Sequence, residues 1–291
     1  MPHTAGKRLI ETIVKQLERV EYFSSAENIS PNVAVHEMRK AFKRLRALLK
    51  FYSDFPDEFS PDFAQQIKFF GRSLTPMRET FVNCQIFDRI SASGNLIADR
   101  KIKTAREKFS EKNREVIEQG FLAAEGYLPV QKFVISLAEQ MERITLETPS
   151  LQQFAGQIQE SYNQSYAIYQ FLTVQSDPEL VHELRKKLKQ LYYQSDFIRY
   201  IHPRFFRLKT YHLNNITEQL GEDHDLFVFL TELQTGECGF SNEELEIIEN
   251  QVQHLREMNR LKLFPKLKQF FAETPEVFKL KTDTIFKIPV V

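Results

Sequence analysis

The fold is decided by the stretch Val35-His-Glu-Met-Arg-Lys-Ala-Phe-Lys-Arg-Leu-Arg-Ala-Leu-Leu-Lys50. Its apolar residues recur at spacings of three and four, the pattern of an amphipathic helix with one buried stripe: Val35, Met38, Phe42, Leu45, Leu49 and Tyr52. At about 100° per residue, the basic residues fall within one arc nearly opposite that stripe. This basic arc consists of His36, Arg39, Lys43, Arg46 and Lys50, with Lys40 and Arg44 beside it.

The charge of this helix is unusually one-sided. From residue 36 to residue 50, six Lys or Arg residues face a single acid, Glu37, which lies outside the arc. A helix face in water normally mixes acids and bases, because opposite charges three or four residues apart support each other. The basic arc therefore predicts an anionic ligand.

A second copy of the stretch occurs as Val181-His-Glu-Leu-Arg-Lys-Lys-Leu-Lys-Gln-Leu191, displaced by 146 residues. The displacement holds without a gap well beyond the helix. Matched positions include His36 with His182, Arg39 with Arg185, Lys40 with Lys186, Lys43 with Lys189, Phe51 with Phe197, Leu74 with Leu220, Glu79 with Asp225, and Val82 with Val228. A register kept over this length indicates an internal duplication.

On these residues the sequence resembles the CHAD domain family (conserved histidine α-helical domain). The resemblance rests on the motif at 36–46, its partial repeat at 182–191, and the segments 74–82 and 220–228, which are similar to the family's Leu-Gly-x-x-Arg-Asp-x-x-Val element. It spans roughly residues 5–260. It implies an all-α fold of two pseudo-symmetric four-helix bundles, with a basic cleft or pore between them that binds inorganic polyphosphate. No catalytic activity comes with it.

The binding residues that the resemblance implies are the cations of the duplicated helix. Most of the charge contact is assigned to Arg39, Lys43, Arg46, Lys50, Arg185 and Lys189, with Lys40, Lys186, His36 and His182 assisting and Arg78 in a secondary position. Several departures from the family pattern count against an equal contribution from both halves. In the second copy, Gln190 and Tyr192 occupy the positions of Arg44 and Arg46 in the first. In the segments similar to the family's Leu-Gly-x-x-Arg-Asp-x-x-Val element, Thr75 replaces the Gly, Glu79 replaces the Asp, and His224 replaces the Arg.

The helical pattern predicts four helices in each half. The expected ranges are 6–22, 31–53, 60–90 and 96–122, then 151–174, 178–200, 204–234 and 241–262. Pro76 should kink or interrupt the third helix, because proline lacks an N–H. We expect an N-terminal half at 1–126, a bridging helix within 127–150, a second half at 151–262 and a C-terminal tail at 263–291.

Composition excludes several function classes. The formal net charge is +0, but residues 210–255 contain ten acids and no Lys or Arg, a segregation that leaves a positive field around the basic arc. Only Cys84 and Cys238 are present, so a disulfide framework or structural zinc site is not expected. The first residues lead into an amphipathic helix, and no apolar run approaches the length of a membrane span. We therefore expect a cytoplasmic protein without membrane association.

Three alternatives remain open at this stage. The basic arc could bind RNA or DNA, although a neutral chain with few stacking aromatic residues in the arc is a poor match. His36 and His182 could serve phosphotransfer or phosphohydrolysis, but no metal site or general base accompanies them. The helices could also form a purely structural scaffold. We expect no catalytic residue, no metal and no cofactor, and as partners inorganic polyphosphate and polyphosphate-associated proteins or granules.

Overall fold

The computed structural model describes residues 2–25, 28–53, 61–92, 97–122, 127–143, 149–235 and 238–287. These residues form helices and no β-strand, as the sequence predicts. Along the described chain, no helix is long and apolar enough to span a membrane. The elements are α1 (Pro2–Ser25), α2 (Pro31–Leu49), the 3-10 turn η1 (Lys50–Tyr52), α3 (Pro61–Ser73), α4 (Thr75–Ser91), α5 (Asp99–Ile117), the π turn η2 (Glu118–Leu122), α6 (Leu128–Arg143), α7 (Leu151–Tyr169), α8 (Pro178–Ile198), α9 (Pro203–Leu233), α10 (Asn242–Phe270) and α11 (Pro275–Lys287).

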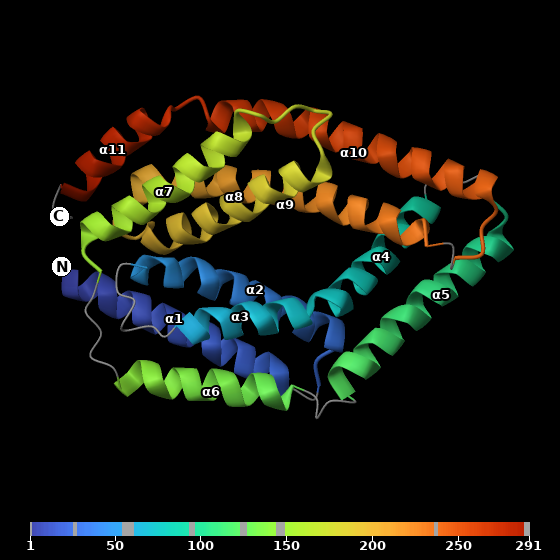
Figure 1. Cartoon of the computed structure of the whole chain (residues 1–291), viewed down its shortest axis with the longest axis horizontal. Helices are drawn as coiled ribbons and strands as arrows, with labels where there is room; N and C mark the ends of the chain where they lie inside the picture. Colours follow the sequence, from blue (N-terminus) through green and yellow to red (C-terminus); the bar gives the residue numbers. More distant parts are fainter. Residues whose placement is uncertain are drawn as a thin grey trace.

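The helices form two groups that meet along α2 and α8 (Figure 1). In the first group α1 packs against α2 and α6, and α3 packs against α2. In the second group α7 packs against α8 and α11, and α8 packs against α9. At the far end from the chain termini, α4 and α5 reach across to α9 and α10 (Figure 1). The matched helices α2 and α8 thus lie at the contact between the groups.

Short-range signals set where the two matched helices begin. Ser30 is the N-cap of α2, with proline in the first turn, although the Ser30 side chain makes no capping hydrogen bond. In α8, Pro178 follows the N-cap Asp177, whose carboxylate accepts from the Glu179 N–H at 3.1 Å. Proline suits the first turn because its missing N–H would have no partner there. Capping boxes begin two further helices: Ser150 with Gln153 in α7, and Ser241 with Glu244 in α10.

The helix expected at 60–90 is interrupted, and this prediction is confirmed. It consists of α3 and α4, which are separated at Leu74, and proline lies in the first turn of α4. The matched part of the second half has Gly221 in place of Thr75 and no proline, and there α9 runs unbroken from Pro203 to Leu233. One proline therefore distinguishes the two halves at the level of the backbone.

The end predicted for the helix at 241–262 is wrong, because α10 continues through Pro265 to Phe270. Proline removes the hydrogen bond to the carbonyl four residues earlier, that of Leu261. Both Leu261 and Pro265 lie on the exposed side of α10, where water can satisfy that carbonyl. The buried side chains of Leu263 and Leu267 meanwhile hold the segment against the core.

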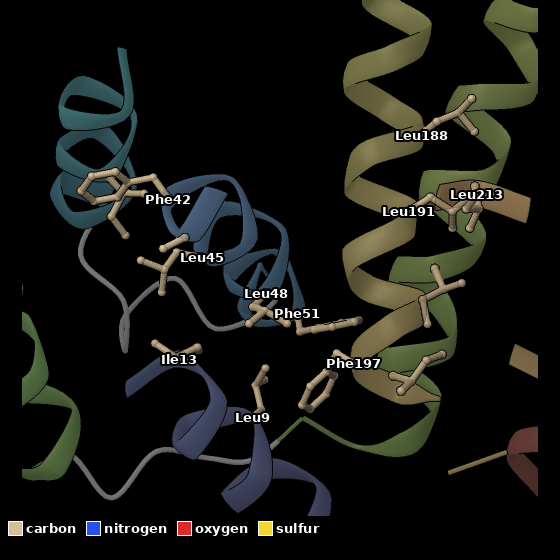
Figure 2. Packing of buried hydrophobic residues seen from close by; sticks show 14 of the residues in the cluster. Leu9, Ile13, Phe42, Leu45, Leu48, Phe51, Leu188, Leu191, Phe197 and Leu213 are labelled. Carbon is tan, nitrogen blue, oxygen red and sulfur yellow. The ribbon is translucent and has the colours of Figure 1, made fainter. Parts of the chain in front are cut away.

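Most buried apolar side chains belong to one large core shared by both groups of helices (Figure 2). Leu9 and Ile13 of α1 face the inner stripe of α2 there. Phe51 and Phe197, which occupy matched sequence positions, have ring centroids 5.7 Å apart, and Phe154 of α7 lies 4.7 Å from Phe51. Each such buried aromatic side chain contributes roughly 1.5–3 kcal/mol of hydrophobic free energy. The contact between the groups is thus an apolar core.

A second, distal core joins the ends of the two groups, where α4 and α5 meet α9 and α10. Phe109 of α5 contacts both Phe87 of α4 and Phe229 of α9, with centroids 5.0 and 5.7 Å apart. Its buried members are Val82, Ile86, Phe87, Ile90, Ile97, Ala105, Phe109, Leu226, Phe229, Leu233, Cys238, Ile248 and Val252.

The acidic stretch at 210–255 is partly neutralised across this distal end. Its acids pair with cations of α4 and α5 at 2.6–2.7 Å: Glu222 with Arg89, Glu232 with Lys112, and Glu244 with Lys101. Glu243 and Glu246 of the same stretch are exposed, whereas Glu244 is held by a partner more than 140 residues away in the sequence.

Candidate anion-binding site

The basic arc lies on the side of α2 away from the large core, as predicted. Val35, Met38, Phe42 and Leu45 are fully buried in that core. Members of the arc differ in exposure. Arg39 and Lys43 are partly buried, while the others are exposed: His36, Lys40, Arg46 and Lys50. The arc therefore has a buried centre and exposed ends.

Five cations from three helices gather at this centre, which we call the cation cluster: Arg39 and Lys43 of α2, Arg78 of α4, and Arg185 and Lys189 of α8. They are brought together because α2 packs against both α8 and α4. Burial lowers the pKa of Arg39, and the charges of Arg78 and Arg185 lower it further. The two copies of the basic helix thus present their cations to each other.

The two arginines at matched positions are held differently. Arg39 Nη1 donates to the Gly71 carbonyl at 3.1 Å and to the Thr75 hydroxyl, so it bridges the break between α3 and α4. Arg185 makes no hydrogen bond or ion pair with any described residue, and its Nε is buried. It lies against the backbone of α9, where a Cβ on Gly221 would be 3.5 Å from Nε and Nη2. At that distance a Cβ would be in ordinary van der Waals contact with the guanidinium, which shows how closely Arg185 packs on α9.

In the cation cluster, the pKa values of the two lysines are lowered to near neutral pH. Burial, together with Arg185 and Arg39, lowers the pKa of Lys43 to about 7. Burial and Arg185 lower the pKa of Lys189 to about 8. Neither ammonium forms an ion pair with a described residue, although Lys189 Nζ lies 5.0 Å above the Tyr192 ring. Both lysines therefore sit in a field that disfavours their positive charge.

Two carboxylates lie among these cations, and the sequence did not predict them as site residues. Burial raises the pKa of Asp225, while Arg185 and Arg78 oppose that rise. Burial also raises the pKa of Glu79, against the effect of Arg39. The signal that could have found them is their pairing at the 146-residue displacement, in the segments that follow each basic helix.

The two predicted histidines have different surroundings. His36 is exposed, and burial and Arg78 lower its pKa. The His182 ring packs on His224 of α9 with centroids 4.0 Å apart, and its Nδ1 is buried without a hydrogen bond to any described residue. Burial and His182 lower the pKa of His224 to about 3. Both rings of this pair are therefore neutral near pH 7. Like Glu79 and Asp225, His224 was not assigned to the site from the sequence.

The other predicted residues lie at the edges of the cluster or outside it. Lys40 is exposed but close enough to lower the pKa of Lys189. Lys186 points outward and pairs with Glu183 one turn earlier. Arg46 is exposed at the surface, and partial burial, followed by the charge of Arg72 in α3, lowers its pKa. Lys50 begins the η1 turn and is exposed.

The chemistry of the cluster favours an anion. Five cations stand against the two carboxylates Glu79 and Asp225, and burial has removed part of their hydration. Uncompensated charge at low solvent exposure is costly, so a bound anion would lower the free energy of the site. Among the described residues, no three His, Cys, Asp or Glu side chains converge to hold a metal ion.

The family model for the CHAD domain matches residues 11–234, from α1 to the end of α9. The chain belongs to the CHAD domain family. A known property of CHAD domains is the binding of inorganic polyphosphate. The fold agrees with a crystal structure of the CHAD domain from the plant Ricinus communis, with a TM-score of 0.61 and 17% sequence identity over 96% of this chain and 91% of that chain. The search of curated proteins gives no match. At this identity the likeness to the plant CHAD domain concerns the fold.

Proposed function

We propose that this CHAD domain binds inorganic polyphosphate at the cation cluster, in a cleft between its two halves. The observation that carries the proposal is the surplus of partly buried cations contributed by both copies of the matched helix. Lys43, Arg185 and Lys189 have no ion pair with any described residue, so their charge is available to a ligand.

Polyphosphate suits this arrangement because it carries about one negative charge per internal phosphate and has no bases to be read. Arg39 and Arg185 offer planar forks of N–H donors that match phosphate oxygens, while Lys43 and Lys189 act as point charges. Arg46 and Arg72 extend the positive surface along α2 and α3 beyond the cluster. A chain of phosphates can follow such a series of cations without a specific sequence.

The proposed role is binding without catalysis. Phosphoryl transfer needs a positioned nucleophile, a base or a metal ion. Glu79 and Asp225 are held among arginines, where they act as counter-charges to the cluster. We extend the proposal to a cytoplasmic protein that can associate with polyphosphate granules.

Competition binding distinguishes this function from its rivals. Fluorescently labelled long-chain polyphosphate would be bound to the protein and followed by anisotropy, with unlabelled polyphosphate, single-stranded RNA and inorganic phosphate as competitors at equal phosphate concentration. We expect displacement by polyphosphate, weaker displacement by RNA and no release of inorganic phosphate from the bound chain. Stronger displacement by RNA would indicate a nucleic-acid site, and phosphate release would indicate an enzyme.

A further inference from the structure

Helix α10 runs along one edge of the molecule (Figure 1), and it carries apolar residues on two opposite sides. On its inner side, the residues buried in the two cores are Ile248, Val252, Leu263 and Leu267. A helix at the surface of a protein normally has a polar outer side. The outer side of α10 does not follow this pattern.

Five apolar residues lie within an arc of about 120° on the outer side of α10. We call them the α10 stripe: Ile247, Leu255, Met258, Leu261 and Pro265. The exposed fractions of Leu255, Met258 and Leu261 are 36, 40 and 55%. Within the described chain, no member of the stripe belongs to either core. A contiguous apolar stripe of this kind is typical of a surface that contacts another protein.

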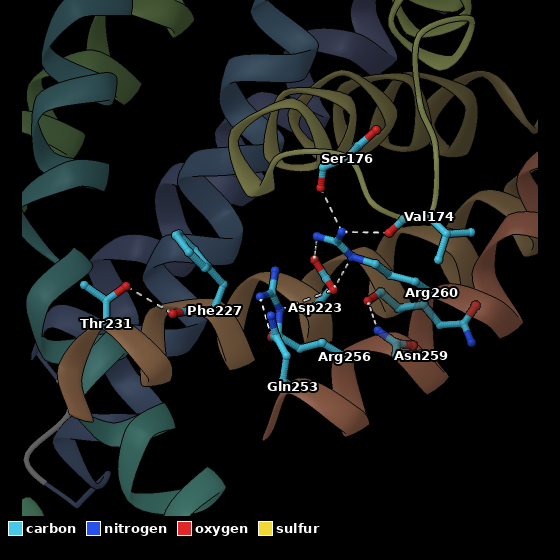
Figure 3. Close-up of polar contacts among 10 residues, drawn as sticks. Val174, Ser176, Asp223, Phe227, Thr231, Gln253, Arg256, Asn259 and Arg260 are labelled. Carbon is cyan, nitrogen blue, oxygen red and sulfur yellow. Dashed lines mark hydrogen bonds and ion pairs between the residues drawn. The ribbon is translucent and has the colours of Figure 1, made fainter. Parts of the chain in front are cut away.

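The inner side of α10 is fixed in place by polar contacts (Figure 3). Arg260 donates to the two carboxylate oxygens of Asp223 in α9 at 2.8 and 3.0 Å. It also donates to the carbonyls of Val174 and Ser176 at 3.0 and 2.8 Å. Rotation of α10 that would bury the stripe would break these contacts, so the stripe stays on the surface of one copy of the chain.

The charged residues beside the stripe are divided by sign along the helix. The exposed ones are, in chain order, Glu243, Glu246, Glu257, Lys262, Lys266 and Lys268. The acids come first and the lysines last. If a second α10 lies antiparallel to the first, the acidic end of each helix meets the basic end of the other, whereas a parallel arrangement places like charges together. The outer face of α10 is therefore complementary to itself, which is the requirement for a two-fold symmetric contact.

We propose that two copies of this protein form a two-fold symmetric dimer through the outer faces of α10, with the two helices antiparallel. The α10 stripes pack on each other, and the opposite charges lie beside them. Both cation clusters remain open in this dimer. The reason is that Asp223, which contacts α10, and Asp225, which lies among the cluster cations, point about 200° apart around α9.

Sedimentation equilibrium of the intact protein, from micromolar to submillimolar concentration, tests the dimer. We expect the wild type to reach the molar mass of two chains. Met258→Glu/Leu261→Glu should keep the molar mass of one chain, because carboxylates at the centre of an apolar contact lose their hydration. The matched control is Leu208→Glu/Leu280→Glu, at leucines of α9 and α11 that are 62 and 68% exposed, and it should dimerise like the wild type. Circular dichroism checks that each variant is folded.

Charge reversal tests the antiparallel arrangement without changing the stripe. Glu243→Lys/Glu246→Lys places lysines against the lysines of the second copy and should weaken the dimer about tenfold. Addition of Lys266→Glu/Lys268→Glu to the same chain restores the opposite charges, so the dissociation constant should return close to that of the wild type.

Two results would overturn the dimer. One is a wild type that stays monomeric over the whole concentration range, which would leave a different protein as the occupant of this face. The other is a dimer that survives Met258→Glu/Leu261→Glu, which would place the contact elsewhere on the molecule. A charge-restored variant that dimerises no better than Glu243→Lys/Glu246→Lys would overturn the antiparallel arrangement.

Discussion

The two halves of the molecule carry the same basic helix in different surroundings. In the first half, Arg39 is anchored to the break between α3 and α4 through the Gly71 carbonyl and Thr75. In the second half, the matched Arg185 rests against Gly221 of an unbroken helix and has no partner among the described residues. One arginine is thus preorganised by its own half, while the other has no hydrogen-bond partner among the described residues.

The neighbours of the matched histidines differ as well. Arg78 lies near His36, and the position matched with Arg78 is His224, which packs on His182. The first half therefore contributes a permanent charge where the second contributes a neutral ring pair. This comparison shows that a repeated motif preserves the position of its cations more readily than the electrostatic environment around them.

The buried polar contacts behind the site also differ between the halves. In the first half, Asn113 donates to the Thr80 hydroxyl at 2.9 Å, a contact between neutral groups. In the second half, Asp223 is 1% exposed and receives two hydrogen bonds from Arg260. We expect the loss of one hydrogen-bond partner to lower the free energy of unfolding more in the second half, because a buried charge is then left uncompensated.

The largest expected effect is on folding stability. Asp223→Asn leaves Arg256 and Arg260 without their shared counter-charge, and should lower the free energy of unfolding by about 3–5 kcal/mol. Thr80→Val removes a neutral partner in the first half and should cost about 1–3 kcal/mol. Urea denaturation measures both, with the exposed Glu243→Gln as a control near zero. Equal losses in Asp223→Asn and Thr80→Val would contradict the contrast between the halves.

The next effect concerns the two matched arginines. Loss of one charged contact costs about 1.5–3 kcal/mol, so Arg185→Gln should weaken polyphosphate binding roughly 10- to 100-fold. Arg39→Gln should weaken binding less, because part of its donor capacity is already used within the protein. It should also lower the melting temperature, which Arg185→Gln should not do. Binding titrations beside thermal melts check this, with exposed Lys103→Gln as the control. Stronger loss of affinity in Arg39→Gln would reverse the assignment.

Binding should also depend on pH through Lys43. Its pKa is about 7 in the free protein, because burial and two arginines disfavour the charge. A bound polyanion raises that pKa, so binding takes up a proton and weakens as the pH rises. Between pH 6 and pH 8, Lys43 alone should reduce affinity about tenfold. Lys43→Arg keeps its charge over this range and should show a smaller change. An identical pH profile in both proteins would exclude Lys43 as the titrating group.

The smallest effect is expected from making the halves more alike. His224→Arg places in the second half the residue that Arg78 provides in the first. We expect polyphosphate affinity at pH 7.5 to rise by a few-fold, on the order of 0.5–1 kcal/mol, because a partly solvated cation adds a modest attraction. Arg78→His should change affinity by a similar factor in the opposite direction. Circular dichroism serves as the folding control, and a fall in affinity for His224→Arg would contradict the scheme.

Local signals account for most of the fold. The apolar spacing of α2 predicted its buried face, and the starts expected at residues 31 and 178 are those of α2 and α8, where proline lies in the first turn. Pro76 correctly indicated the break between α3 and α4, because loss of an N–H acts on the chain next to it. The four cluster cations of α2 and α8 were also predicted, since they share one helical face and a matched copy, whereas Arg78 of α4 was predicted only in a secondary position.

Non-local contacts account for what the sequence did not predict. The roles of Glu79 and Asp225 depend on α4 and α9 lying beside both basic helices, which no local pattern encodes. The ion pair of Glu244 with Lys101 was not predicted, because the two residues are far apart in the chain. The continuation of α10 through Pro265 depends on tertiary packing, which outweighs the local preference to end the helix there.

The central claim is that cations from both halves form one binding site. Its most direct test is calorimetric titration of long-chain polyphosphate into the wild type and into Arg39→Glu/Arg185→Glu, each at two salt concentrations. We expect saturable wild-type binding that weakens steeply with salt, as counter-ions are released, and no measurable binding in a variant with unchanged helical content. Binding that persists in the folded variant, or that is insensitive to salt, would contradict the claim.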